Sequence, residues 1–149
     1  SWVYASKGNN FAKTMLRLAQ QHTELTVIND QVGAPTGAEL LADCTAHAIR
    51  VAVRKPEVAG LYHLVASGET TWYDYAALVF VEAAKADIPL AIKTLNAVGT
   101  HNYPTPARRP LNSRLDTTKF QTTFDLVLPA WESGVKRMLN EWFSATSGK

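Results

Sequence analysis

The sequence is poor in cysteine, in long apolar runs and in blocks of charge. Cys44 is the only cysteine among 149 residues, so an internal disulfide is impossible and a cytoplasmic, reducing location fits. Its place in a predicted helix indicates a small buried hydrophobe. No apolar run reaches the ~18 residues of a membrane span, so no membrane partner is expected. The net charge is only +2 and Lys/Arg runs stop at two residues, so nucleic acid is not an expected partner either.

Motifs that mark several enzyme classes are missing as well. None of the eight glycines forms the Gly-x-Gly-x-x-Gly pattern of a dinucleotide site. The sequence has no phosphate-binding P-loop, no Gly-x-Ser-x-Gly elbow and no Cys/His cluster. The four histidines are dispersed, which is typical of surface or satisfied core positions. A function must therefore be sought in less local patterns.

Strand-like and helix-like segments alternate along the chain, which predicts an α/β fold. The predicted helices span residues 11–21, 37–54, 72–85, 116–120 and 130–143. Their starts carry capping or first-turn residues: Asn10, Thr70 or Thr71, Asp116 and Pro129. The strand candidates are 1–4, 25–30, 60–66 and 90–98, and the proline-rich segment 99–114 should be irregular.

These strands are too few and too short for a complete doubly wound sheet. The chain has no initiator Met, and "SWVY" at its start resembles the end of a strand. We therefore expect a piece of a larger protein, folded over residues 1–144 with a disordered tail at 145–149. The first strand should pair with parallel strands outside this chain, which would leave an exposed edge and an apolar face. We expect either self-association through that surface or disorder at the N-terminus.

The loop "NDQVGAPTGAEL" joins a short strand to a long helix. Thr36 and Glu39 have the spacing of a capping box just before an apolar run, which accounts for the second half of the loop. A turn has no particular need for Asp30 and Gln31 in the first half. The residue pattern therefore leaves open whether this half of the loop is only a turn or part of a site.

"YASK", from Tyr4 to Lys7, resembles the Tyr-x-x-x-Lys pair in which a lysine lowers the pKa of a catalytic tyrosine. The spacing is one residue short, and Gly8 follows at once. A loop cannot place the two side chains on one helical face. We therefore do not assign catalysis to this pair.

"ARRPLNSRLD", residues 107–116, carries the strongest polar pattern. Arg109 could form a bidentate clamp on a phosphate, and Asn112 and Ser113 could donate to the same anion or to a sugar hydroxyl. The alternative is a solvated basic loop before a capped helix. Trp2 has a similar choice between core packing and a ligand at the carboxyl end of a strand.

Five segments, taken in order, resemble the C-terminal half of the dTDP-4-dehydrorhamnose reductases, a family of extended short-chain dehydrogenases. They are "SWVY", "NNFAKTML", "NDQVGAPTGAELLAD", "GLYHLVASGETTWYDYA" and "ARRPLNSRLDTTKF". The resemblance covers residues 1 to about 144. It implies the substrate-binding part of a Rossmann-like enzyme, without the N-terminal dinucleotide-binding sheet or the catalytic Tyr/Lys pair.

The resemblance also implies roles for individual residues. Trp2 would line the deoxysugar pocket, and the Gln31–Thr36 loop would help to enclose the substrate. Asp30 and Gln31 would form the substrate-facing part. The family's substrate-side motif, near the nucleotide diphosphate, matches Arg109, Asn112 and Ser113. Some bacterial members bind Mg²⁺ between subunits through glutamates, and the corresponding residues here are Glu39 and Glu141.

For the whole enzyme, the resemblance implies reduction of dTDP-4-dehydro-L-rhamnose to dTDP-L-rhamnose, a precursor of O-antigen, by NADH or NADPH. The sequence does not decide between these cofactors. A dTDP-sugar and a second subunit are the implied partners, and the chain alone should be inactive. The open alternatives are a non-catalytic sugar-nucleotide-binding or regulatory module, and half of a related epimerase or dehydratase.

Overall fold

The computed structural model describes residues 1–103, 107 and 109–147. Helices and short strands are mixed along them, as expected of an α/β chain, but they do not strictly alternate: three strands follow one another before the second α-helix, and the last two α-helices have no strand between them. The strands are β1 (Val3–Tyr4), β2 (Glu24–Ile28), β3 (Val32–Gly33), β4 (Thr36–Gly37), β5 (Thr70–Thr71) and β6 (Thr94–Val98). The α-helices are α1 (Phe11–Gln21), α2 (Ala38–Arg54), α3 (Trp72–Lys85), α4 (Thr118–Phe124) and α5 (Trp131–Ser147). Short 3₁₀ turns occur at Pro56–Val58 and Thr100–Asn102.

In the described ranges the strands pair two by two. β2 runs parallel to β6 over five residues, from Glu24 opposite Thr94 to Ile28 opposite Val98. β3 is antiparallel to β5. β1 is parallel to β4, so the expectation that its parallel neighbours all lie outside this chain is wrong. The chain returns beside its own start, where the Thr36 amide donates to the Trp2 carbonyl at 3.3 Å.

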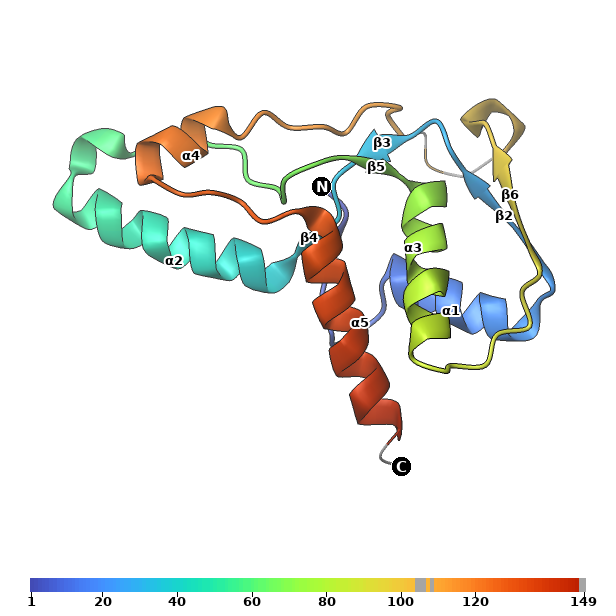
Figure 1. Cartoon of the computed structure of the whole chain (residues 1–149). Helices are drawn as coiled ribbons and strands as arrows, with labels where there is room; N and C mark the ends of the chain where they lie inside the picture. The colour runs from blue at the N-terminus through green and yellow to red at the C-terminus, as the bar shows by residue number, and fades with distance from the viewer. Residues whose placement is uncertain (104–106, 108, 148–149) are drawn as a thin grey trace.

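The main body is built around α3, with α1 and α5 packed against it (Figure 1). The largest fully buried side chains here are Leu16, Tyr75, Val79, Met138 and Leu139. The predicted inner face of the last helix is confirmed, since Trp131, Val135, Met138 and Leu139 are buried and Trp142 is partly buried. A second face of α1 and α3 packs on β2 through Met15, Ala76 and Val27.

Helices α2 and α4 form an arm that projects from this body (Figure 1). The arm has a small core of its own, made by Cys44, Phe120, Phe124 and Leu128. Cys44 is buried as predicted, and burial raises the pKa of its thiol. It is the one residue of α2 that is fully buried, so most of this helix remains in contact with solvent.

Two predicted helix starts are confirmed in atomic detail. The Asn10 side chain accepts a hydrogen bond from the Lys13 amide at 3.0 Å, which caps α1. Thr71 accepts from the Asp74 amide at 3.0 Å and donates to the Asp74 carboxylate at 2.7 Å, which caps α3. α1 and α3 span the residues that their sequence patterns predict.

The predicted capping box at the start of α2 is wrong. Thr36 is fully buried in β4, where its hydroxyl donates to the Ala34 carbonyl at 3.0 Å and accepts from the Ala66 amide at 3.2 Å. Glu39 instead forms an ion pair with Arg137. The Thr36 hydroxyl thus accepts from the Ala66 amide, thirty residues away, and makes no capping hydrogen bond to α2.

Four other details differ from prediction. Residues 60–66 form no strand, and the strand that follows them is β5. α4 continues past Phe120 to Phe124, and α5 begins at Trp131, two residues after Pro129. α5 is helical to Ser147, so residues 145–147 do not form the expected disordered tail, and 148–149 lie outside the described residues.

Candidate functional site

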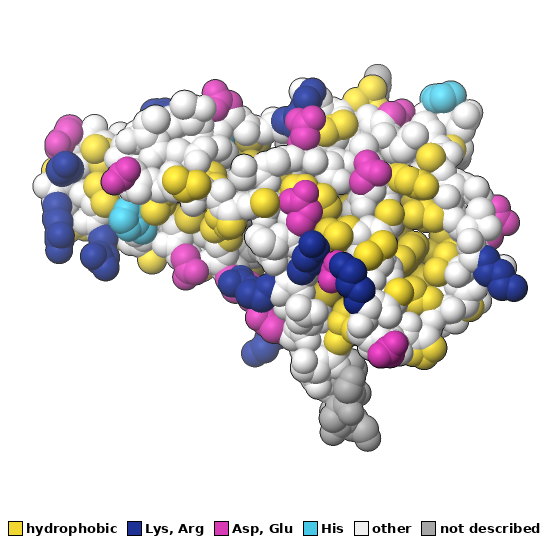
Figure 2. Space-filling view, viewed as in Figure 1, with side chains coloured by type: hydrophobic (Ala, Val, Ile, Leu, Met, Phe, Trp, Pro, Cys, Tyr) yellow, Lys and Arg dark blue, Asp and Glu magenta, His cyan; other side chains and the backbone are white. Residues whose placement is uncertain are grey.

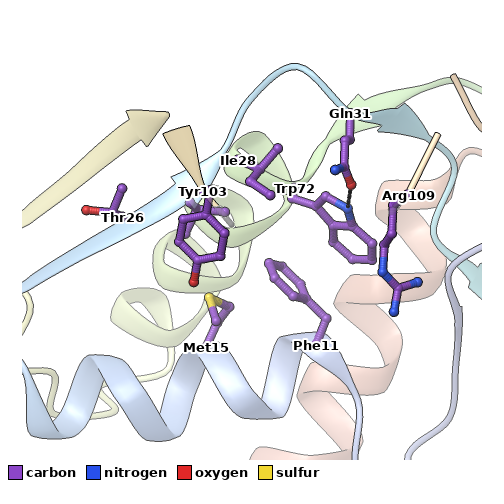
Figure 3. A pocket seen from close by; sticks show the side chains of 9 residues that line it. Phe11, Met15, Thr26, Ile28, Gln31, Trp72, Tyr103 and Arg109 are labelled. Carbon is purple, nitrogen blue, oxygen red and sulfur yellow. Dashed lines mark hydrogen bonds between the residues drawn. The ribbon is translucent and has the colours of Figure 1, made fainter. Parts of the chain in front are cut away.

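A cavity of about 320 Å³ opens between α1, β2 and α3 (Figure 3). Its walls are mostly apolar and aromatic, with a few polar groups. The lining residues are Phe11, Met15, Thr26, Val27, Ile28, Gln31, Trp72, Tyr103 and Arg109. An apolar hollow with a small number of fixed polar groups is the usual form of a small-molecule site.

Gln31 is the buried polar group of this cavity, with only 5% of its surface exposed. Its side-chain oxygen accepts from the indole N–H of Trp72 at 3.1 Å, and its side-chain nitrogen donates to the Thr100 hydroxyl at 3.1 Å. Figure 3 shows the amide above the Trp72 ring, on the side where Arg109 also approaches. The amide is therefore fixed at both ends.

Trp2 and Trp72 form a stacked aromatic pair beside the cavity. Their ring centroids are 3.8 Å apart and the planes are inclined by 19°. Trp2 has a positive φ of 51°, which is uncommon and strained for a bulky residue. A Cβ on Gly33 would lie 2.8 Å from the Trp2 ring, so the stack depends on glycine at position 33. Trp72 lines the cavity and Trp2 packs behind it. On the Trp72 ring, Phe11 makes a further contact, with ring centroids 4.6 Å apart.

Asp30, next to Gln31 in the chain, supports the same network from outside the cavity. Its carboxylate accepts from the Thr100 hydroxyl at 2.6 Å and from the Thr100 amide at 2.9 and 3.0 Å. The hydrogen bonds from Thr100 lower the pKa of Asp30 below its ordinary value. Asp30 is therefore a charged acceptor at neutral pH, and it contacts Thr100 rather than the cavity.

Arg109 supplies the positive charge of the site. Its side chain lies at the cavity beside Trp72 and Gln31, while the residue itself is exposed to solvent (Figure 3). A guanidinium at the mouth of an aromatic hollow can bind an anion while the rings contact a neighbouring apolar or sugar group. The arrangement thus suits a ligand with both a ring and a phosphate.

Asn112 and Ser113 lie elsewhere, along β3. The Ser113 amide donates to the Val32 carbonyl at 2.8 Å, and the Asn112 side chain accepts from the backbone and the guanidinium of Arg114, both at 3.0 Å. The structure therefore brings Gln31 and Arg109 together on the cavity, with Trp2 one ring behind. Asn112 and Ser113 are not among the lining residues.

Comparison with known proteins decides the family. A family model described as the RmlD substrate binding domain matches residues 1–143. The chain belongs to this family. The RmlD family relationship covers both the body and the arm of the fold.

Two bacterial relatives match nearly the whole length of this chain. It is 78% identical over 147 residues to the dTDP-4-dehydrorhamnose reductase of Escherichia coli K12, and 75% identical to that of Salmonella typhimurium LT2. Each match covers 99% of this chain but 49% of the relative. The chain thus spans about half the length of these relatives.

Solved structures of RmlD-family reductases have the same fold. A dTDP-4-dehydrorhamnose reductase from Bacillus anthracis, in complex with NADP, matches with a TM-score of 0.81 and 30% identity. The match covers 95% of this chain and 46% of that one. The Clostridium acetobutylicum reductase matches with a TM-score of 0.75 and 32% identity over 94% of this chain and 46% of its own. The predicted fold class is therefore confirmed.

The residues of this RmlD-family chain do not fit a dinucleotide site. None of its glycines forms the required fingerprint. Tyr4 is buried in a separate hollow between the starts of α2 and α5, and burial raises its pKa to about 12. Tyr4 therefore lies away from the cavity that Gln31 and Arg109 line.

A metal site is not formed by this chain's own side chains in the described ranges, where no group of three or more His, Cys, Asp or Glu residues comes together. Glu39 places a carboxylate oxygen 2.7 Å from the Arg137 guanidinium, and Glu141 is exposed on α5. The two glutamates of one chain would supply only part of the six oxygen ligands that Mg²⁺ prefers. Within the same ranges, no helix is long and apolar enough to cross a membrane.

Reasoning from sequence missed Phe11, Trp72 and Tyr103, which line the cavity, and Thr100, which accepts a hydrogen bond from Gln31 without lining it. Phe11 and Trp72 follow helix periodicity and are indistinguishable from core residues in the sequence. Thr100 lies 69 positions from Gln31 and lacks a motif. Only an aromatic residue immediately after a capping Thr, as at Trp72, could have suggested a ring at the mouth of the fold.

Proposed function

We propose that this chain is the sugar-nucleotide-binding half of a dTDP-4-dehydrorhamnose reductase. The observation that carries the proposal is the convergence of Gln31, Arg109 and an aromatic wall on one cavity, in a chain 78% identical to such a reductase. The whole protein would reduce dTDP-4-dehydro-L-rhamnose to dTDP-L-rhamnose for O-antigen synthesis. The names of the relatives give no support to a non-catalytic module.

The task of this chain in that reaction is to bind and orient the sugar nucleotide. NADH or NADPH, bound by the other half, would supply the hydride. Because this sequence lacks the glycine fingerprint of a dinucleotide site, we assign substrate contacts to its residues. Arg109 would pair with the diphosphate, Gln31 would hydrogen-bond the sugar, and the face of the Trp2–Trp72 pair would exclude water from the ring.

A binding experiment tests the assignment of Arg109. Titration of dTDP and dTDP-rhamnose into the chain should give measurable affinity, weakened roughly tenfold by Arg109→Ala, since a charged hydrogen bond is lost. Arg17→Ala, at an exposed position on α1, is the matched control and should bind like the unchanged chain. Equal binding by both variants would contradict the role of Arg109.

An activity experiment tests the division of labour. The chain alone should not consume NADH or NADPH in the presence of the dTDP-keto-sugar, whereas the whole protein should. Steady consumption by the chain alone would contradict the proposal that catalysis needs the other half. An inactive whole protein that still binds dTDP-rhamnose would favour the non-catalytic module.

The proposal includes a cytoplasmic homodimer. Magnesium between subunits would need Glu39 to leave Arg137 or to share its carboxylate, together with Glu141 and the partner's equivalents. Calorimetric titration of the whole protein with Mg²⁺ should give heat that Glu39→Gln abolishes. The absence of any heat from the unchanged dimer would remove magnesium from the proposal, while leaving the sugar-nucleotide site intact.

A further inference from the structure

A single line of hydrogen bonds leads from the wall of the cavity to a carboxylate outside it. Trp72 donates to Gln31, Gln31 donates to Thr100, and Thr100 donates to Asp30, over distances of 3.1, 3.1 and 2.6 Å. The line joins α3, the loop after β2 and the turn after β6. Elements far apart in the sequence therefore meet through polar contacts at one point.

The direction of every hydrogen bond in this line is fixed by chemistry. An indole nitrogen can only donate, so the atom of Gln31 facing Trp72 must be its oxygen. The amide nitrogen then faces Thr100 and must donate, which makes the Thr100 hydroxyl the acceptor of that bond. The hydroxyl proton is left for Asp30, whose ionised carboxylate can only accept.

The fixed direction has a consequence for the cavity. Rotation of the Gln31 amide by half a turn would place N–H against N–H at Trp72, so the cavity always meets the same edge of the amide. The Trp72 ring is held by its N–H, and the Trp2 ring stacks on it at 3.8 Å. Asp30 and Thr100 thus lie at the far end of the contacts that orient both rings.

Apart from the 3₁₀ turn that begins at Thr100, where the Thr100 carbonyl accepts from the Tyr103 amide at 3.1 Å, the contacts of Asp30 and Thr100 lie in this line. Both are only partly buried, and neither is part of a hydrophobic core cluster. The Asp30 carboxylate takes the hydroxyl and the amide of Thr100, which is a complete local clamp. A clamp of this kind fixes the position of the Thr100 hydroxyl, which is the atom that Gln31 needs.

We propose that Asp30 and Thr100 are positioning residues for the sugar pocket, acting through the Gln31 amide on the orientation of Trp72 and Trp2. The inference rests on the proposed function for the identity of the ligand. It concerns residues that do not touch that ligand. Its first test needs no substrate, so the two proposals can fail separately.

The first test measures ring stacking in the chain itself. Closely stacked indoles give an exciton couplet in far-ultraviolet circular dichroism, and Trp2→Phe identifies the part due to this pair. Thr100→Val keeps the shape of the side chain but removes the hydroxyl, so it should lose most of that couplet. Thr100→Ser keeps the hydroxyl and should therefore keep the couplet. Thr122→Val, which removes an exposed helical hydroxyl on α4, is the matched control and should leave the couplet unchanged.

The second test measures substrate affinity in the whole protein. Thr100→Val should raise KM for the dTDP-keto-sugar about fivefold, the expected effect of losing one hydrogen bond, while KM for NADH or NADPH stays the same. Asp30→Ala should have a similar effect. The double variant should be no worse than either single one, because both changes break the same line.

The outcomes separate the two proposals. A loss of the couplet with an active, higher-KM enzyme supports both. If Thr100→Val loses the couplet in the chain but the unsubstituted whole protein is inactive, the positioning role is supported and the proposed reductase function is contradicted. Thr100→Val with an unchanged couplet, or with an unchanged KM in an active enzyme, overturns the positioning role, even if thermal stability falls.

Discussion

At the scale of single residues, Gln31 is the side chain that joins Trp72 to Thr100 by hydrogen bonds. Gln31→Ala should lower the free energy of unfolding by about 1–3 kcal/mol, because the Trp72 N–H and the Thr100 hydroxyl lose their shared partner. Chemical denaturation measures the change. Gln20→Ala, at an exposed position of α1, should stay within about 0.5 kcal/mol of the unchanged chain. Equal effects at the two positions would contradict the buried network.

Tyr4 links stability to alkaline pH. Burial raises its pKa from 10.0 to about 12, so the folded state holds the phenolic proton more tightly than the unfolded state does. The stability due to this difference is complete below the unfolded pKa and is lost as pH rises through about 10 to about 12. Denaturation at several pH values should show this decline, and Tyr4→Phe should make it less steep. Part of the decline should remain in that variant, because burial also raises the pKa of Tyr75. An equally steep decline in Tyr4→Phe would place its origin elsewhere.

At the scale of elements, α5 stabilises the body through one buried face. Val135→Ala should cost about 2 kcal/mol, because Val135 is fully buried between α5 and the core around Tyr75. Val127→Ala makes the same chemical change at a side chain that is 93% exposed, so it should cost less than about 0.5 kcal/mol. Denaturant midpoints compare the two. Similar midpoints would mean that α5 is not packed as described.

The helices show where sequence reasoning succeeds and where it stops. α1 and α3 were predictable because their caps are local, with Asn10 bound to Lys13 and Thr71 bound to Asp74. The capping box at Thr36 failed because its hydroxyl serves a backbone amide thirty residues away. Local patterns cannot report that a distant group needs the same oxygen.

The site follows the same rule. Gln31 and Arg109, two of the predicted substrate-binding residues, both line the cavity, while their contacts with a ligand stay a prediction. Their meeting on one cavity with Trp72 and Tyr103 depends on how α3 packs against β2, which no spacing in the sequence encodes. The roles of Asn112 and Ser113 in substrate binding stay a prediction, since their observed contacts are to β3 and Arg114.

At the scale of the whole molecule, the body and the arm differ in how they are held. Figure 2 shows yellow apolar side chains around the hollow of the body, and basic side chains near the far end of the arm. The body buries long side chains from three helices, whereas the arm relies on the small core around Cys44. The arm should therefore open more readily than the body.

Hydrogen exchange tests this difference. Amides of α2 should exchange faster than those of α1 and α3, because α2 has a single fully buried residue. Mass spectrometry after short labelling times measures the rates segment by segment. Equal protection of α2 and α3 in the dilute chain would show that the arm and body unfold as one unit.

The contact between Gly33 and Trp2 restricts how this protein can change over generations. A methyl group at position 33 would lie 2.8 Å from the indole, so Gly33→Ala in a single step would displace Trp2 from Trp72. A lineage could accept alanine there only after replacing Trp2 by a smaller side chain. Positions 2 and 33 should therefore vary together among descendants, although 31 residues separate them, and the order of the two substitutions should be the same each time.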